Sequence, residues 1–160
     1  MLLEFSVENY RSFYEQQVLS LIADESKVEF EAQLIAASNE SKLLSTAVIY
    51  GANASGKSNL MKATAALRKL ILYSAKNSPN QSFEEYDPFQ FHEDSEQAPT
   101  YFSIDFLLNE IRYHYELGIL KDYVLSESLH FYPKGREAKL FSRKKQKFEF
   151  GEHLKGQKAV

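Results

Sequence analysis

The sequence contains no cysteine, and this absence excludes two classes of protein. A secreted fold held by disulfides and a zinc site built on thiolates both require cysteine. The four histidines (His92, His114, His130 and His153) lack the spacing of metal ligands, so we interpret them as incidental. No apolar run approaches the ~20 residues of a membrane-spanning helix, and the first residues do not resemble a signal peptide. We therefore expect a cytoplasmic protein with no membrane partner.

The overall composition is that of an ordinary globular domain, with 44% hydrophobic and 26% charged residues in a chain of 160. The net charge of -3 conceals an asymmetry, because residues 1–130 carry a net charge of -9 and residues 131–160 carry +6. Most of the positive charge lies in the segment 134–147. We interpret this segment as a solvated hairpin, and contact with nucleic acid is the alternative.

The pattern of apolar residues predicts strands and one helix in the first part of the chain, residues 1–76. Residues 3–7 alternate between apolar and polar side chains, which is typical of a strand, and residues 17–23 are a second candidate. Residues 41–50 end in the apolar run AVIY, which indicates a strand buried on both faces. From Lys57, apolar residues recur at three- and four-residue steps, which predicts a helix of about five turns ending at residue 74.

The rest of the chain reads as a connection followed by antiparallel strands. Residues 77–99 hold three of the four prolines and many acids, so we expect a long connection in which the apolar island DPFQF packs against the domain. Residues 100–160 alternate as in an antiparallel meander, with turns at residues 109–110 and 133–135. The expected strands are 102–108, 111–119 and 124–132, with short strands near 139–142 and 147–150.

The stretch that carries chemistry is GANASGKS, residues 51–58, which satisfies the P-loop pattern G-x-x-x-x-G-K-[ST]. A glycine-bounded loop lets successive backbone N–H groups point at phosphates, and the following helix adds the positive end of its dipole. Lys57 would neutralise phosphate oxygens, and the Ser58 hydroxyl would be a ligand of Mg²⁺. A glycine turn without a ligand is the alternative. The candidate binding residues are Gly51, Asn53, Ala54, Ser55, Gly56, Lys57, Ser58 and Asn59.

A complete hydrolytic site also needs an acid at the end of a neighbouring apolar strand, and no convincing one is present. Asp24 and Glu25 follow an apolar run, but that run precedes the loop and is interrupted by Ser20. Asp105 lies inside an alternating strand rather than at its end. We therefore expect the residues that would hydrolyse ATP to be absent from this chain.

Several stretches together resemble the amino-terminal part of the RecF/SMC-like ABC ATPases. They are LLEFSVENYRSF at residues 2–13, IYGANASGKSNLMKA at 49–63, the DPFQF island and PTYFSIDFLLNEIRYHYELGI at 99–119. The nearest resemblance is to bacterial AAA-family ATPases of abortive infection and phage defence, relatives of the OLD nucleases. In such families the turn after the first strand lies next to the P-loop. The resemblance thus implies that Arg11, and less surely Ser12, reaches the phosphates, and a turn cap or an ion pair is the alternative for Arg11.

The resemblance implies an α/β fold, with the whole chain 1–160 as the first lobe of an ABC-type head that has a mixed sheet and an antiparallel meander. It implies ATP and Mg²⁺ as cofactors, and a cytoplasmic ATPase coupled to DNA processing or to control of a phage-defence effector. The implied partners are the remainder of the head, a second head in a homodimer, and DNA or a nuclease effector. Walker B and signature segments are not found, so we expect the isolated chain to be inactive. A self-contained small kinase or GTPase, and a nucleic-acid-binding module using the basic segment, are the alternatives.

Overall fold

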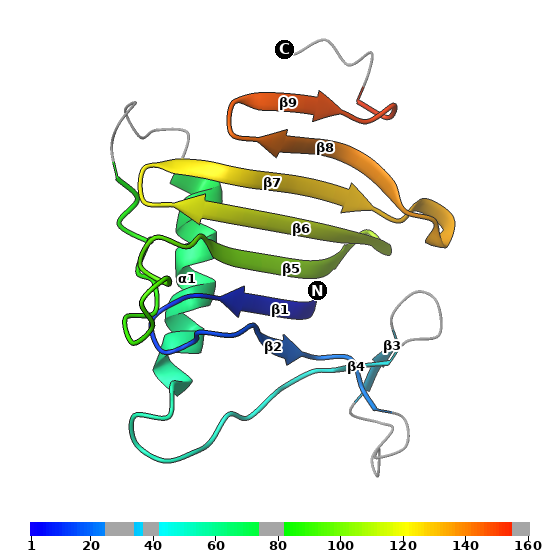
Figure 1. Cartoon of the computed structure of the whole chain (residues 1–160). Helices are drawn as coiled ribbons and strands as arrows, with labels where there is room; N and C mark the ends of the chain where they lie inside the picture. Colours follow the sequence, from blue (N-terminus) through cyan, green and yellow to red (C-terminus); the bar gives the residue numbers. More distant parts are fainter. Residues whose placement is uncertain (25–33, 37–41, 74–81, 155–160) are drawn as a thin grey trace.

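A large sheet dominates the computed structural model, which describes residues 1–24, 34–36, 42–73 and 82–154. The helix α1 (Lys57–Tyr73) lies across one face of this seven-stranded sheet (Figure 1). Two short strands, β3 (Leu34–Ala36) and β4 (Lys42–Leu44), pair separately. The strands of the large sheet follow the order β2 (Gln17–Ser20), β1 (Leu2–Glu8), β5 (Thr100–Leu108), β6 (Ile111–Leu120), β7 (Tyr123–Phe131), β8 (Ala138–Lys144) and β9 (Lys147–Phe150).

The antiparallel meander expected for the second half is confirmed, because β5 to β9 pair in sequence order. The tight turn between β5 and β6 places Asn109 and Glu110 at φ 50° and 64°, a left-handed pair that matches the twist of a two-residue hairpin. β1 joins the same sheet by pairing with β5, so that Val7 lies opposite Phe102. Both halves of the sequence therefore build one sheet.

The core lies between α1 and the sheet, and the expected helical pattern produces it. The buried helix residues Ala63, Ala66, Leu67 and Leu70 recur at three- and four-residue steps, as the sequence predicts. They pack against apolar residues that alternate along the strands. The fully buried members of the sheet include Phe5, Val7, Phe102 and Ile119. The helix is confirmed as far as Tyr73, and residue 74 lies outside the described residues.

The expectation of a buried strand at 41–50 is wrong, and so is the expectation of a mixed sheet. Among the described residues of this stretch, 42–50, the strand is limited to Lys42–Leu44. The apolar run that follows is open to solvent, with Val48 81% and Tyr50 90% exposed. Within the described residues this run pairs with no other strand. A β-strand requires backbone hydrogen bonds to a neighbouring strand, so the run does not form one here. All the recorded pairings in the large sheet are antiparallel as a result.

The acidic connection is described from residue 82, and it packs against the turn between β1 and β2. Asn9 is the centre of this contact, because its buried amide donates to the Ser95 carbonyl at 2.9 Å and its Oδ1 accepts from the Phe89 N–H at 3.1 Å. The Phe89 ring lies 5.5 Å from the Tyr14 ring. The prediction that the DPFQF island packs against the domain is confirmed.

Candidate functional site

The glycine-bounded loop, residues 51–56, leads directly into the first turn of α1 at one edge of the domain (Figure 1). Ala54 at φ 63° and Gly56 at φ 93° take left-handed conformations, which curl the loop back on itself. The Ser55 N–H donates to the Ala52 carbonyl at 3.3 Å and closes the curl. The sequence therefore forms a compact turn at the start of α1, where a P-loop is expected.

The Lys57 side chain forms hydrogen bonds with residues of this loop. Its Nζ donates to the Gly51 carbonyl at 2.8 Å and to the Ala52 carbonyl at 2.7 Å, with the Ser55 hydroxyl at 3.4 Å. The ammonium group therefore folds back toward the residues that start the loop. A cation fixed at this place would neutralise charge on an anion bound by the loop.

The backbone N–H groups of the loop are available to such an anion. In the described part of the chain, the N–H groups of Asn53, Ala54, Gly56 and Lys57 donate to no backbone carbonyl. The first N–H groups of a helix have no partner within the helix, and the helix dipole favours negative charge there. Free donors, a fixed ammonium and a helix N-terminus form the chemical arrangement that binds phosphate.

The remaining predicted residues lie in or beside this loop. Asn53 is exposed within it, and Ser58 is exposed in the first turn of α1, so both polar groups can reach a ligand. Asn59 is half-buried in the first turn of α1, and its Nδ2 donates to the Ser12 hydroxyl at 2.8 Å. The turn between β1 and β2 therefore lies against the loop, as the resemblance implies.

Gly56 is the position where this contact is tightest. A Cβ atom there would lie 3.1 Å from Phe13 Cε1 and 3.1 Å from the Ser12 hydroxyl, in a backbone conformation that side chains rarely adopt. Gly135 also has a positive φ, at 77°, but nothing lies within 4 Å of its added Cβ. The two glycines thus share strained backbone and differ in crowding.

Gly56→Ala should destabilise the protein by about 2 kcal/mol, because left-handed strain and crowding add together. Gly135→Ala, the matched control, should cost about 1 kcal/mol from the backbone term alone. Urea unfolding of the two variants beside the wild type measures the difference. Equal losses in the two variants would show that the contact of Ser12 and Phe13 with the loop is loose.

Arg11 forms an ion pair, the second of the two interpretations that the sequence leaves open. Its Nη2 lies 2.8 Å from Asp87 Oδ2, and its N–H donates to the Asp87 carbonyl at 2.7 Å. Both side chains are about one-third exposed. Arg11 is therefore one residue from the contact with the loop and is held by the DPFQF island.

The described acids that the sequence suggests for hydrolysis, Asp24 and Asp105, do not occupy the position expected of a hydrolytic acid, at the end of a strand beside the loop. Asp105 is buried in β5, where its carboxylate binds Arg112 Nη2 at 2.6 Å and His114 Nδ1 at 2.7 Å. Asp24 is exposed, and Glu25 lies outside the described residues. No group of three or more possible metal-ligating side chains occurs within the described ranges.

The cluster of Asp105, Arg112 and His114 was missed by the sequence interpretation, which treated His114 as incidental. Burial alone would raise the pKa of Asp105, but the hydrogen bonds from His114 and Arg112 outweigh it and lower the pKa. The Asp105 hydrogen bond raises the pKa of His114. The signal was the spacing in IRYHYE, because charged residues two positions apart on a strand share one face.

This cluster should make stability depend on pH. The His114 pKa is raised above 6.5, so its contribution is complete below about pH 6.5 and is lost as pH rises through the folded-state pKa. The Asp105 pKa is lowered below 3.8, so its contribution is complete above about pH 4 and is lost as pH falls. Urea unfolding at pH 6 and at pH 9 measures this dependence. Between these two pH values, the free energy of unfolding should fall less in His114→Gln than in the wild type. An unchanged pH dependence in that variant, with the exposed His92→Gln as control, would contradict this.

The basic segment lies at the opposite edge of the sheet from β2. It forms the short 3-10 helix Pro133–Gly135 and the hairpin of β8 and β9. Lys139 pairs with Glu149 at 3.2 Å, and Arg143 lies 3.4 Å from Glu127. These contacts match the solvated hairpin that we expect, and they reduce the free positive charge on it.

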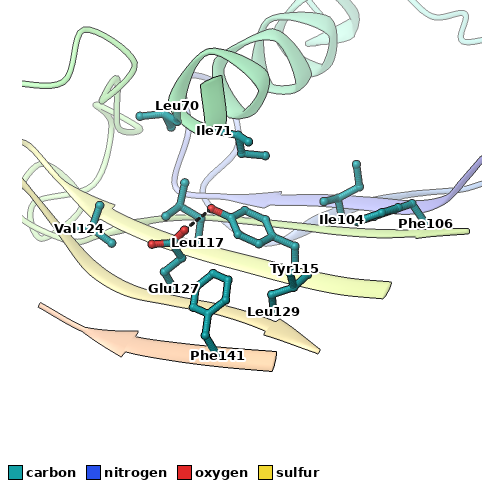
Figure 2. A pocket seen from close by; sticks show the side chains of 10 residues that line it. All are labelled: Leu70, Ile71, Ile104, Phe106, Tyr115, Leu117, Val124, Glu127, Leu129 and Phe141. Atoms are coloured by element: carbon teal, nitrogen blue, oxygen red, sulfur yellow. Dashed lines mark hydrogen bonds between the residues drawn. The ribbon is translucent and has the colours of Figure 1, made fainter. Parts of the chain in front are cut away.

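A separate apolar pocket of about 520 Å³ lies between the end of α1 and the sheet (Figure 2). The Tyr115 hydroxyl donates to Glu127 Oε1 at 2.9 Å within it. Leu70 lines the pocket and lies thirteen residues from Lys57, which corresponds to about 20 Å along a helix. The pocket is therefore distinct from the glycine-bounded loop, and it has few polar groups to bind a nucleotide.

One comparison with known protein families found a match. The matching family is described as AAA domain, AbiEii toxin, Type IV TA system, and the match covers residues 47–153, more than half of the chain. It includes the loop, α1, and the strands from β5 to β9. No curated protein matches the chain. No helix within the described ranges is both long enough and apolar enough to span a membrane.

Proposed function

The chain belongs to this family of AAA domains, which are ATPases related to abortive infection, and we propose on that basis that it binds ATP and Mg²⁺ as a lobe of an ABC-type ATPase. The observation that carries the proposal is the curled loop around Lys57. Its Nζ is held at 2.7 to 2.8 Å by two loop carbonyls, while four N–H groups of the loop and the helix start donate to no backbone carbonyl in the described part of the chain. This donor set fits a triphosphate.

The roles of the residues follow from their chemistry. The N–H groups of the loop donate to phosphate oxygens, and Lys57 neutralises their charge. The exposed Ser58 hydroxyl supplies an oxygen ligand, the type that Mg²⁺ prefers. Bound Mg²⁺ would withdraw charge from the phosphates during hydrolysis. Asn59 would hold the turn that contains Ser12 against the loop, through its hydrogen bond to the Ser12 hydroxyl.

Completion of the ATPase by further protein is part of the proposal. The exposed apolar run at 47–50 supports it, because Val48, Ile49 and Tyr50 precede a P-loop and are 42% to 90% exposed. A continuous apolar run of this kind is typical of a strand that lies inside a sheet buried on both faces. We place the hydrolytic acids, the signature segment and a second head in that further protein, with DNA or a nuclease effector as the target.

Titration with Mg–ATP tests the proposed function. The wild type should bind ATP, and Lys57→Ala should not.

The basic hairpin offers a second candidate function in nucleic-acid binding, but no feature of its geometry favours it over a solvated hairpin. The small-kinase alternative needs phosphoryl transfer by this chain, and the buried engagement of Asp105 removes one candidate acid for it.

A further inference from the structure

The turn between β1 and β2 brings a charged pair to the edge of the loop. Ser12 contacts Asn59 at 2.8 Å, and both Ser12 and Phe13 limit the space beside Gly56. Arg11 precedes Ser12, and consecutive Cα atoms lie 3.8 Å apart. Arg11 and its ion pair with Asp87 therefore lie at the turn that contacts the loop.

Asp87 fixes that charge in two ways. Its carboxylate accepts from Arg11 Nη2 at 2.8 Å, and its backbone carbonyl accepts from the Arg11 N–H at 2.7 Å. Arg11 has φ 53°, a conformation that neighbouring contacts must hold in place. Its Nε atom is buried, and no acceptor for it occurs among the residues that the structure describes. A buried donor without an acceptor calls for an explanation, and a guanidinium pulled toward Asp87 gives one.

Two other acids of the connection, Glu84 and Glu85, are engaged with a lysine of α1. Glu84 and Glu85 lie 2.7 Å and 2.6 Å from Lys69 Nζ, so that lysine offsets their charge. Asp87 is thus the acid that the structure assigns to Arg11.

We propose that Asp87 limits the affinity of the loop for polyphosphates by neutralising Arg11. The inference rests on the proposed function, because it assumes that the loop binds phosphate. A guanidinium without its carboxylate would add one positive charge beside the ligand, and the attraction would grow with the number of phosphates. The acidic connection would then set how tightly nucleotide is held, although Asp87 lies 31 residues after Gly56 in the chain.

The first variant is Asp87→Asn, which removes the charge and keeps the shape of the side chain. Calorimetric titration should show about three- to ten-fold tighter binding of Mg–ATP, a smaller gain for ADP, and no change for adenosine. Asp87→Glu should restore the wild-type affinity. Glu93→Gln removes an exposed acid of the same connection and should change the ATP affinity by less than two-fold. A residue with only a structural role would not give an effect graded by phosphate number.

The second variant, Arg11→Gln with Asp87→Asn, covers the case in which Asp87→Asn does not fold. It leaves no charge unpaired, and its ATP affinity should stay within about two-fold of the wild type. A more than ten-fold loss in this double variant would overturn the proposal, because Arg11 would then contribute net affinity with Asp87 in place. Unchanged ATP binding by a folded Asp87→Asn would also overturn it, provided that wild-type binding depends on Lys57. Absence of any ATP binding by the wild type would instead refute the proposed function.

Discussion

Lys57→Ala should weaken the binding of Mg–ATP by about 100-fold or more, to a level that titration does not detect. The Lys57 ammonium is the one cation that the loop itself encloses, held by the carbonyls of Gly51 and Ala52. Its removal takes away both the charge that opposes the phosphates and the contacts that keep the loop curled.

Stability must be followed in the same experiment, because a collapsed loop and a lost charge both reduce binding. Lys57 is only partly buried, so Lys57→Ala should retain the fold and the cooperative unfolding of the wild type. Lys62→Ala is a matched control, because Lys62 is an exposed lysine of the same helix, outside the loop. ATP affinity in Lys57→Ala equal to that of the wild type would remove the basis for the nucleotide site.

Phe5→Ala should lower the free energy of unfolding by about 3–5 kcal/mol. Phe5 is fully buried in β1 and belongs to the cluster that joins α1 to the sheet. Truncation removes apolar surface and leaves a cavity that the flanking strands β2 and β5 restrict from closing. A loss of this size is a large part of the 5–15 kcal/mol that stabilises a typical domain.

Phe91→Ala is the matched control, because it makes the same change on a ring that is 91% exposed. Its cost should be below about 1 kcal/mol, since the Phe91 ring has one edge contact with Phe89. Urea unfolding at a single pH compares the two variants with the wild type. Similar losses for Phe5 and Phe91 would mean that the core does not lie between α1 and the sheet.

Local sequence patterns predict the helix and the meander because the hydrogen bonds of these elements join residues that are close in the sequence. The 3.6-residue period of α1 and the two-residue turn at Asn109 and Glu110 depend on residues close in sequence. The place of β1 beside β5 could not be predicted in this way, since its partner lies about 100 residues away. The antiparallel pairing that places it there is a property of the whole domain.

The run AVIY shows the limit of an apolar pattern. Its composition indicates a strand, but a strand also needs a partner for its N–H and C=O groups, and sequence alone does not say whether one is present. The loop was easier to predict, because the residues from Gly51 to Asn59 are contiguous. Arg11 was left with two interpretations, because its partner Asp87 becomes visible only when the connection packs against the turn.

Backbone amide chemical shifts, recorded as Mg–ATP is added, locate the nucleotide most directly. The largest changes should fall on residues 51–58, with smaller changes at Ser12 and Phe13, whose side chains contact the loop. The same titration of Lys57→Ala should leave these signals unchanged. Changes confined to the basic hairpin at 134–147 or to the apolar pocket beside Leu70, with the loop signals unmoved, would contradict the assignment of residues 51–58 as the ATP site.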